Sequence, residues 1–162
     1  MKNNRIQKII TLLLCSSLAI LIACSDNDST SDSSVENKLT VMVYSSANNN
    51  LESALLMDIQ EMKIGATNNQ GYSIIVLINR SAGNSDDASV LYEDFSGTKL
   101  YQVKDKKVIE LDGKEILPEI GPDKDFQANM GDPAVLKKFI QYGKTYFPAE
   151  KYALIFGGHG DG

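Results

Sequence analysis

The residues best suited to chemistry lie at the end of the chain, where an apolar run leads into glycines and a histidine. Residues 152–156 predict a buried strand, and His159, the single histidine of the chain, follows two glycines. Ligands of open α/β sheets bind at the carboxyl ends of the strands. An imidazole exchanges protons near neutral pH, and glycines let the backbone approach a substrate closely. The pattern therefore predicts an acid–base role for His159, with an ordinary surface histidine as the alternative.

The elements that must position this histidine are three apolar strands and two helices. The strands are expected at 39–44, 72–78 and 152–156. The first helix follows the first strand, with Asn49 or Asn50 as its cap and Gly65 as its stop. The second opens at Asp132-Pro133, a cap followed by a proline at the first helical position. Gly143, on the apolar stripe of the second helix, allows a close approach to the sheet.

Between the second strand and the second helix the pattern becomes that of short antiparallel strands. We expect these at 90–95, 99–103 and 108–111, followed by an exposed loop at 114–129. The order of elements predicts an α/β fold, with a mostly parallel sheet, flanking helices and a small β-hairpin insertion. Three parallel strands leave a long apolar edge. We therefore expect an incomplete domain whose carboxyl-terminal half is absent from this chain.

The first 38 residues differ in composition from the rest. Residues 1–23 have a basic start and an apolar stretch, as in a secretory signal peptide, with a retained anchor helix as the alternative. The end of the stretch, Leu21-Ile22-Ala23-Cys24, resembles the lipobox of bacterial lipoproteins, which implies cleavage before Cys24 and a lipid on its sulfur. Residues 24–38 form an acidic, low-complexity tether. Its start resembles the export signal of surface lipoproteins in some Gram-negative bacteria, with a plain solvated spacer as the alternative.

The numbers of cysteines and charged residues argue against several classes of function. The chain has two cysteines, Cys15 and Cys24. If Cys15 leaves with the signal peptide and Cys24 carries lipid, the mature chain has no free thiol, no disulfide and no cysteine metal site. Cleavage removes three of 16 basic residues, which leaves 13 against 21 acidic ones and a net charge of −8. Such a chain is a poor candidate for binding nucleic acid. The sequence thus predicts an exported protein, lipid-anchored to the outer membrane.

Four segments together resemble the clostripain family of cysteine peptidases. They are residues 40–52, 130–133, 147–155 and 158–162, in the order and spacing of that family, and the resemblance runs from about residue 39 to the end. It implies a caspase-like fold, a Cys/His dyad and cleavage after arginine or lysine. Residues 39–162 would then be the amino-terminal part of the peptidase domain. Its partner would be the missing carboxyl-terminal half or a cysteine-bearing heavy chain.

The resemblance also implies roles for single residues. His159 matches the catalytic histidine, and Gly160 matches the glycine whose backbone N–H holds the oxyanion. Asn48, Asn49 and Asn50 follow the first strand and lie at the same sheet edge. The family often has aspartate where Asn48 stands, so a charged role at that position is not carried over. The nucleophilic cysteine is expected beyond residue 162, and this chain alone is expected to be inactive.

The sequence also bears on cofactors and on alternative functions. No cofactor is required and no metal ligands are predicted, although some family members use calcium. Protein or peptide substrates with basic residues are expected. One alternative is a non-catalytic surface lipoprotein that binds peptides or a partner chain. A nucleotide or flavin binder is a weaker alternative, because residues 45–50 after the first strand contain no glycine and no G-x-G-x-x-G pattern.

Overall fold

The computed structural model describes residues 37–66, 71–81 and 89–160. They belong to one compact unit, Ser34–Gly162. The predicted signal peptide at 1–23, the predicted lipidation site Cys24 and nearly all of the predicted tether lie outside the described residues. Among the described helices, none is long and apolar enough to cross a membrane.

Five strands form one mixed sheet in the order β4-β3-β2-β1-β5. β1 pairs in parallel with both β2 and β5, and the β3–β4 hairpin joins the sheet antiparallel to β2. This confirms the predicted α/β fold, with a mostly parallel sheet and a hairpin insertion. The elements in chain order are β1 (Asn37–Ser46), α2 (Glu52–Gly65), β2 (Tyr72–Arg80), β3 (Gly97–Lys104), β4 (Lys107–Leu111), α3 (Pro133–Tyr146) and β5 (Ala149–Gly157).

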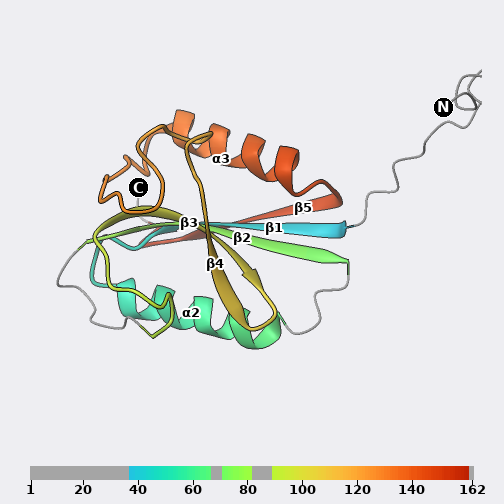
Figure 1. Cartoon of the computed structure of the whole chain (residues 1–162), viewed down its shortest axis with the longest axis horizontal. Coiled ribbons are helices and arrows are strands. Elements are labelled where there is room, and N and C mark those ends of the chain that lie inside the picture. Colours follow the sequence, from blue (N-terminus) through green and yellow to red (C-terminus); the bar gives the residue numbers. More distant parts are fainter. Residues whose placement is uncertain (1–36, 67–70, 82–88, 161–162) are drawn as a thin grey trace, which may run out of the picture. The chain divides into compact units, whose positions relative to one another are not determined.

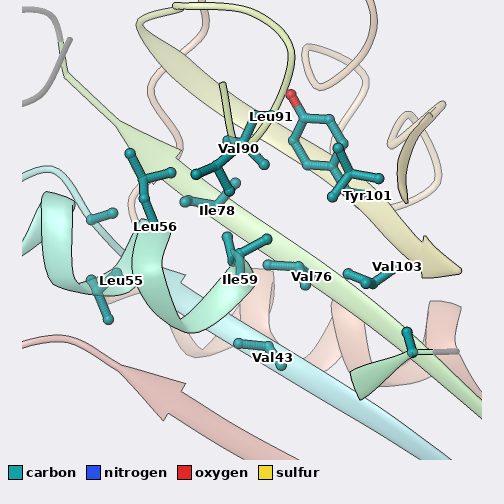
Figure 2. Close-up of a cluster of buried hydrophobic side chains, with 13 residues drawn as sticks. Val43, Leu55, Leu56, Ile59, Val76, Ile78, Val90, Leu91, Tyr101 and Val103 are labelled. Carbon is teal, nitrogen blue, oxygen red and sulfur yellow. The ribbon is translucent and has the colours of Figure 1, made fainter. Parts of the chain in front are cut away.

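The two helices cover opposite faces of the sheet (Figure 1). Side chains of a strand point alternately to the two faces of a sheet, so β1 contributes residues to the hydrophobic core on each face. Val43 packs under α2 with Leu56, Ile59 and Val76, as Figure 2 shows. Met42 and Tyr44 face α3, in the cluster that includes the buried Phe139. The sheet is therefore held rigidly between two hydrophobic layers, and its strand ends are fixed positions for functional side chains.

Two sequence predictions about the second helix are confirmed: Asp132 caps it, and Gly143 lets it approach the sheet closely. The Asp132 carboxylate accepts the backbone N–H of Ala134 at 2.8 Å and caps α3. Gly143 lies against the sheet, where a Cβ atom would stand 2.5 Å from Sδ of Met42 and 3.1 Å from Cδ1 of Ile75. The absence of a side chain at Gly143 thus permits the close approach of α3 to β1 and β2.

The segment 90–95 is not a strand, which corrects the sequence-based expectation. Tyr92 has φ +66°, a left-handed conformation that interrupts any strand. The carbonyl of Val90 accepts Lys63 Nζ at 2.9 Å, so a side chain from α2 replaces a strand partner. The apolar residues that suggested a strand, Val90 and Leu91, belong to the turn and are buried in the core on the α2 side.

Three further expectations are corrected. The region 114–129 is irregular but not wholly exposed, because Ile116 and Ile120 are fully buried in the core on the α3 side. Neither Asn49 nor Asn50 caps α2, since Leu51 occupies the cap position without a side-chain bond. β5 is not buried: Phe156 is 62% exposed, because β1 is the neighbour of β5 on one side and no described strand pairs on the other.

Candidate active site

The ends of β1 and β5 bring the predicted site residues together. The two strands are parallel and paired with Ser45 opposite Gly157. The segments that leave them, 46–50 and 158–160, therefore emerge side by side at the carboxyl edge of the sheet. This register places His159 near the asparagines that follow β1, although 109 residues separate His159 from Asn50 in the sequence.

A hydrogen bond joins His159 to Asn50. Nε2 of the imidazole lies 2.8 Å from Oδ1 of Asn50. An amide oxygen can only accept, so the Nε2–H group donates and the neutral ring carries its proton on Nε2. The other nitrogen, Nδ1, is then the basic atom of the ring. His159 is exposed to solvent, so this base is accessible to a reacting group.

The three asparagines after β1 do different things. Asn49 stabilises its own turn, donating to the carbonyl of Ser46 at 2.8 Å and accepting the N–H of Leu51 at 2.8 Å. Asn48 donates to Oε1 of Gln127 at 3.2 Å. Of the three, Asn50 is the one hydrogen-bonded to the histidine. The loop is therefore fixed on both sides of Asn50, which keeps the amide acceptor in place for His159.

A cleft of about 580 Å³ opens beside the histidine, between the strand ends and the start of α3. His159, Gly160 and Asn49 line it, whereas Asn48 and Asn50 do not. Its other walls are mostly apolar, with Tyr44, Phe156 and Leu136 among them, and Asp132 is the one carboxylate of the lining. Gly160 has φ +72°, a conformation that favours glycine, and it turns the chain along the rim of the cleft. A polypeptide side chain fits a cleft of this volume and wall chemistry.

Tyr44 connects the cleft to the core. Its hydroxyl donates to the carbonyl of Met130 at 3.0 Å, and its ring packs edge-on against Phe156 with centroids 6.0 Å apart. Burial, and secondarily the negative charge of Asp132, raises the pKa of Tyr44 to about 12. The phenol therefore stays protonated at neutral pH and can keep donating its hydrogen bond.

A buried ion pair beneath the same sheet edge was not anticipated from the sequence. Nε of Arg80, at the end of β2, bonds Oε1 of Glu52 in the first turn of α2, and both side chains are fully buried. Arg80 also pairs with Asp94 at 3.1 Å, and its backbone carbonyl accepts Nε2 of Gln127 at 2.6 Å. The sequence held one indication that Arg80 is buried. Arg80 is the last residue of a strand that otherwise consists of seven apolar or small residues and one asparagine.

Neither a cysteine nor a metal-binding cluster is found among the described residues. Cys15 and Cys24 both precede Asn37, the first residue that the structure describes. In the part of the chain that the structure describes, no group of three or more His, Cys, Asp or Glu side chains is arranged to hold a metal ion.

Sequence comparison supports the resemblance. The sequence profile of the Clostripain family matches residues 43–162. Clostripain from Hathewaya histolytica is 48% identical over 134 residues, which cover 83% of this chain and 26% of that protein. This chain thus spans about a quarter of the length of that relative.

Solved structures share the fold. A cysteine protease of B. fragilis is 26% identical, with a TM-score of 0.54 over 77% of this chain and 91% of that one. A clostripain from Bacteroides thetaiotaomicron ATCC 29148, in complex with the peptide inhibitor BTN-VLTK-AOMK, is 15% identical, with a TM-score of 0.53 over 79% and 95% of the two chains. The class of fold is therefore that of clostripain-like cysteine proteases. With the profile match over most of its length, the chain belongs to the clostripain family.

Proposed function

We propose that this chain is the amino-terminal, histidine-bearing part of an exported, lipid-anchored cysteine endopeptidase that cleaves after arginine or lysine. The observation that carries the proposal is the His159–Asn50 hydrogen bond of 2.8 Å at the carboxyl end of β5. It leaves Nδ1 as an accessible base beside a cleft, in a chain of a cysteine peptidase family.

The proposed reaction uses both protonation states of the ring. Nδ1 of His159 accepts the thiol proton of a cysteine, and the thiolate sulfur attacks the scissile carbonyl. The backbone N–H of Gly160 donates to the resulting oxyanion; loss of one such donor in hydrolases costs about 100- to 1000-fold in rate. The imidazolium then gives its proton to the leaving amine as the C–N bond breaks. Water hydrolyses the acyl-enzyme and regenerates the thiol.

We place the nucleophilic cysteine outside residues 1–162, on a strand that pairs with the open side of β5. Two features support this position. Ile155 and Phe156 on β5 are 46% and 62% exposed, which suits burial by a further element. A strand parallel to β5 would end at the same sheet edge as His159. This chain by itself is then inactive, and its partner is the rest of the polypeptide or a separate heavy chain.

The test of catalysis uses the protein that contains this chain, extended to its natural carboxyl end. Wild-type protein is expected to release the amine from an arginine-amide substrate, and His159→Ala to lose nearly all of that activity. Lys137→Ala, on the exposed face of α3, is the matched control and should stay active. An active enzyme indifferent to His159→Ala would refute the assignment. No activity in a folded wild type would favour the peptide-binding alternative.

Selectivity for basic residues is tested on the same enzyme. Arginine and lysine amides should be cleaved with kcat/KM at least about tenfold above that for a neutral isostere, the discrimination expected for one charged contact. Equal rates for the neutral substrate would contradict this part of the proposal and leave the peptidase assignment intact. Activity that persists with a calcium chelator would support a cofactor-free enzyme, and loss of activity would reveal calcium dependence.

Lipid anchoring rests on the four residues that end at Cys24. A labelled fatty acid should be incorporated by cells that express the wild type and by those that express Cys15→Ser, but not by Cys24→Ser. The wild type should fractionate with the outer membrane and be accessible to external protease if it reaches the cell surface. Incorporation that survives Cys24→Ser would exclude this anchor.

A further inference from the structure

Exposed lysines gather at the end of the sheet opposite His159. The strands β1, β2 and β5 begin at this amino edge, and the β3–β4 turn lies there because β3 runs antiparallel to β2. The helices α2 and α3 end on the same side, and Figure 1 shows these strand starts and helix ends together on the right. The exposed lysines of this amino edge are Lys38, Lys104, Lys106, Lys107, Lys144 and Lys151.

Backbone contacts hold these lysines in a row across the sheet. Lys104 and Lys107 form the last pair of the hairpin, directly opposite one another. The N–H of Lys106 donates to the carbonyl of Ala66 at 3.3 Å, which ties the hairpin turn to the end of α2. The N–H of Lys38 donates to the carbonyl of Gly71 at 2.7 Å. Lys151 lies on β5, paired with Leu39 of β1. The backbone positions of these lysines are therefore fixed by the fold.

The amino edge has the opposite charge to the chain as a whole. Its described carboxylates are Asp105, Glu150 and Glu61, which lies one turn before the end of α2, together with Asp112 and Glu115, which interact electrostatically with Tyr142 beside the edge. With Lys114, which pairs with Asp112, seven lysines stand against five carboxylates among the described residues, a charge of +2 in a chain whose net charge is −5. Like charges directly opposite on paired strands, as in the hairpin, destabilise a sheet. None of the ion pairs among the described residues involves the six exposed lysines of the edge.

Tyrosines accompany the lysines. Tyr146 is 53% exposed and Tyr152 is 37% exposed, and both lie near the amino edge. Nζ of Lys144 is 5.8 Å from the ring centre of Tyr152, and the rings of Tyr142 and Tyr146 contact each other at a tilt of 41°, with centroids 4.6 Å apart. Tyrosine rings with a polar tip are favoured where an apolar phase meets water.

We propose that the amino edge is a membrane-contact surface that binds anionic lipid headgroups. A shallow row of exposed lysines with tyrosines beside it matches a flat layer of negative headgroups. The described chain enters β1 at this edge, at Asn37. His159 follows the other end of the nine-residue β5, roughly 30 Å away. Contact through the amino edge therefore presents the candidate active site to the surroundings.

The test measures binding of the protein that contains this chain, produced without residues 1–24 so that no lipid is attached. Its sedimentation is followed with vesicles of phosphatidylcholine alone and of equal parts phosphatidylcholine and phosphatidylglycerol. Binding to the anionic vesicles only, weakened by salt, is expected. Each lysine near an anionic surface contributes about fivefold in affinity, so Lys104→Gln, Lys106→Gln and Lys107→Gln together should weaken binding roughly 100-fold.

A matched triple variant controls for total charge. Lys124→Gln, Lys137→Gln and Lys138→Gln remove the same charge from exposed positions elsewhere and should bind almost as the wild type does. Lys38→Gln, Lys144→Gln and Lys151→Gln should repeat the loss with other residues of the edge. Equal loss in the control, or equal binding to neutral vesicles, would overturn the proposal. Binding to an acidic protein or polyanion but not to vesicles would also do so. His159→Ala should bind normally, so the result does not depend on catalysis.

Discussion

A single hydrogen bond decides which nitrogen of His159 is basic. If Asn50→Ala removes the acceptor, the ring can rotate and exchange its tautomers, and kcat/KM is expected to fall about tenfold, the value of a typical hydrogen bond. Asn50→Asp keeps the acceptor and adds a negative charge, which favours the imidazolium, so the acidic limb of the pH–rate profile should move to higher pH. Steady-state kinetics over a pH series measures both effects.

The neighbouring asparagine supplies the control for that measurement. Asn48 bonds Gln127 and not His159, so Asn48→Ala should leave the acidic limb of the profile where it is. If Asn50→Ala and Asn48→Ala change kcat/KM and the pH profile equally, the effect is a general loosening of the loop, and the positioning role of Asn50 is refuted.

Tyr44 is expected to make the fold sensitive to alkali. Its pKa of about 12 in the folded chain exceeds the value of 10.0 for a free tyrosine, so the folded state favours the protonated phenol. The stability that this contributes is complete below pH 10 and is lost as the pH rises through 12. In urea unfolding, Tyr44→Phe should therefore show a shallower loss of stability than wild type over this range. An unchanged slope would contradict the prediction. Tyr101 and Tyr142, whose pKa values burial also raises, contribute to the remaining slope.

Sequence reasoning put His159 and the three asparagines at one sheet edge but did not single out Asn50 as the hydrogen-bond partner, for a physical reason. A lone histidine after an apolar run is visible in the sequence because strand and glycine turn are both local patterns. Which of three adjacent asparagines meets it depends on the register of β1 against β5 and on the turn of Asn49. The Glu52–Arg80 pair is hidden for the same reason, since 28 residues separate its members.

Among the secondary-structure elements, α2 and β2 are locked together by that buried pair. Truncating one member leaves the other charge buried without its main partner, so Glu52→Ala should lower the free energy of unfolding by about 3–5 kcal/mol. Glu61→Ala, an exposed glutamate of the same helix, should change it by less than about 0.5 kcal/mol. Replacing both members, as Glu52→Met with Arg80→Met, should recover much of the loss because no unpaired charge remains. Denaturant unfolding of the four proteins measures this; a double variant as unstable as Glu52→Ala would contradict the account.

Elements with strong local signals were predictable, and those held by distant side chains were not. β2 is nearly all apolar and β-branched, and α3 starts with a cap and a proline, so both were found. The segment 90–95 has the composition of a strand, but lysine side chains from elsewhere bind it. Lys63 donates to the backbone carbonyl of Val90, and Lys99 pairs with the carboxylate of Glu93. Lys99 binds Glu93 at 2.7 Å, and no periodicity in the sequence reports such a contact.

The domain as a unit has one side that its own described residues leave open. β5 pairs along β1, and no described strand covers its other side, where Ile155 is exposed. An uncovered apolar edge strand promotes association between chains. Residues 37–162 alone should therefore self-associate as concentration rises, and Ile155→Lys should shift the equilibrium to monomer. Met57→Lys places the same charge on an exposed apolar position of α2 and should not.

The same two variants behave differently if the rest of the protein covers β5. In the protein that contains this chain, Ile155 would then be buried, and Ile155→Lys should destabilise by about 2–5 kcal/mol, as for an unpaired charge placed in a core. Met57→Lys should stay near wild type. Sedimentation of residues 37–162 measures the self-association, and thermal unfolding of the protein that contains this chain measures the loss of stability. An Ile155→Lys variant that alters neither would show that β5 is a true outer edge, and the cysteine would have to reach His159 from another direction.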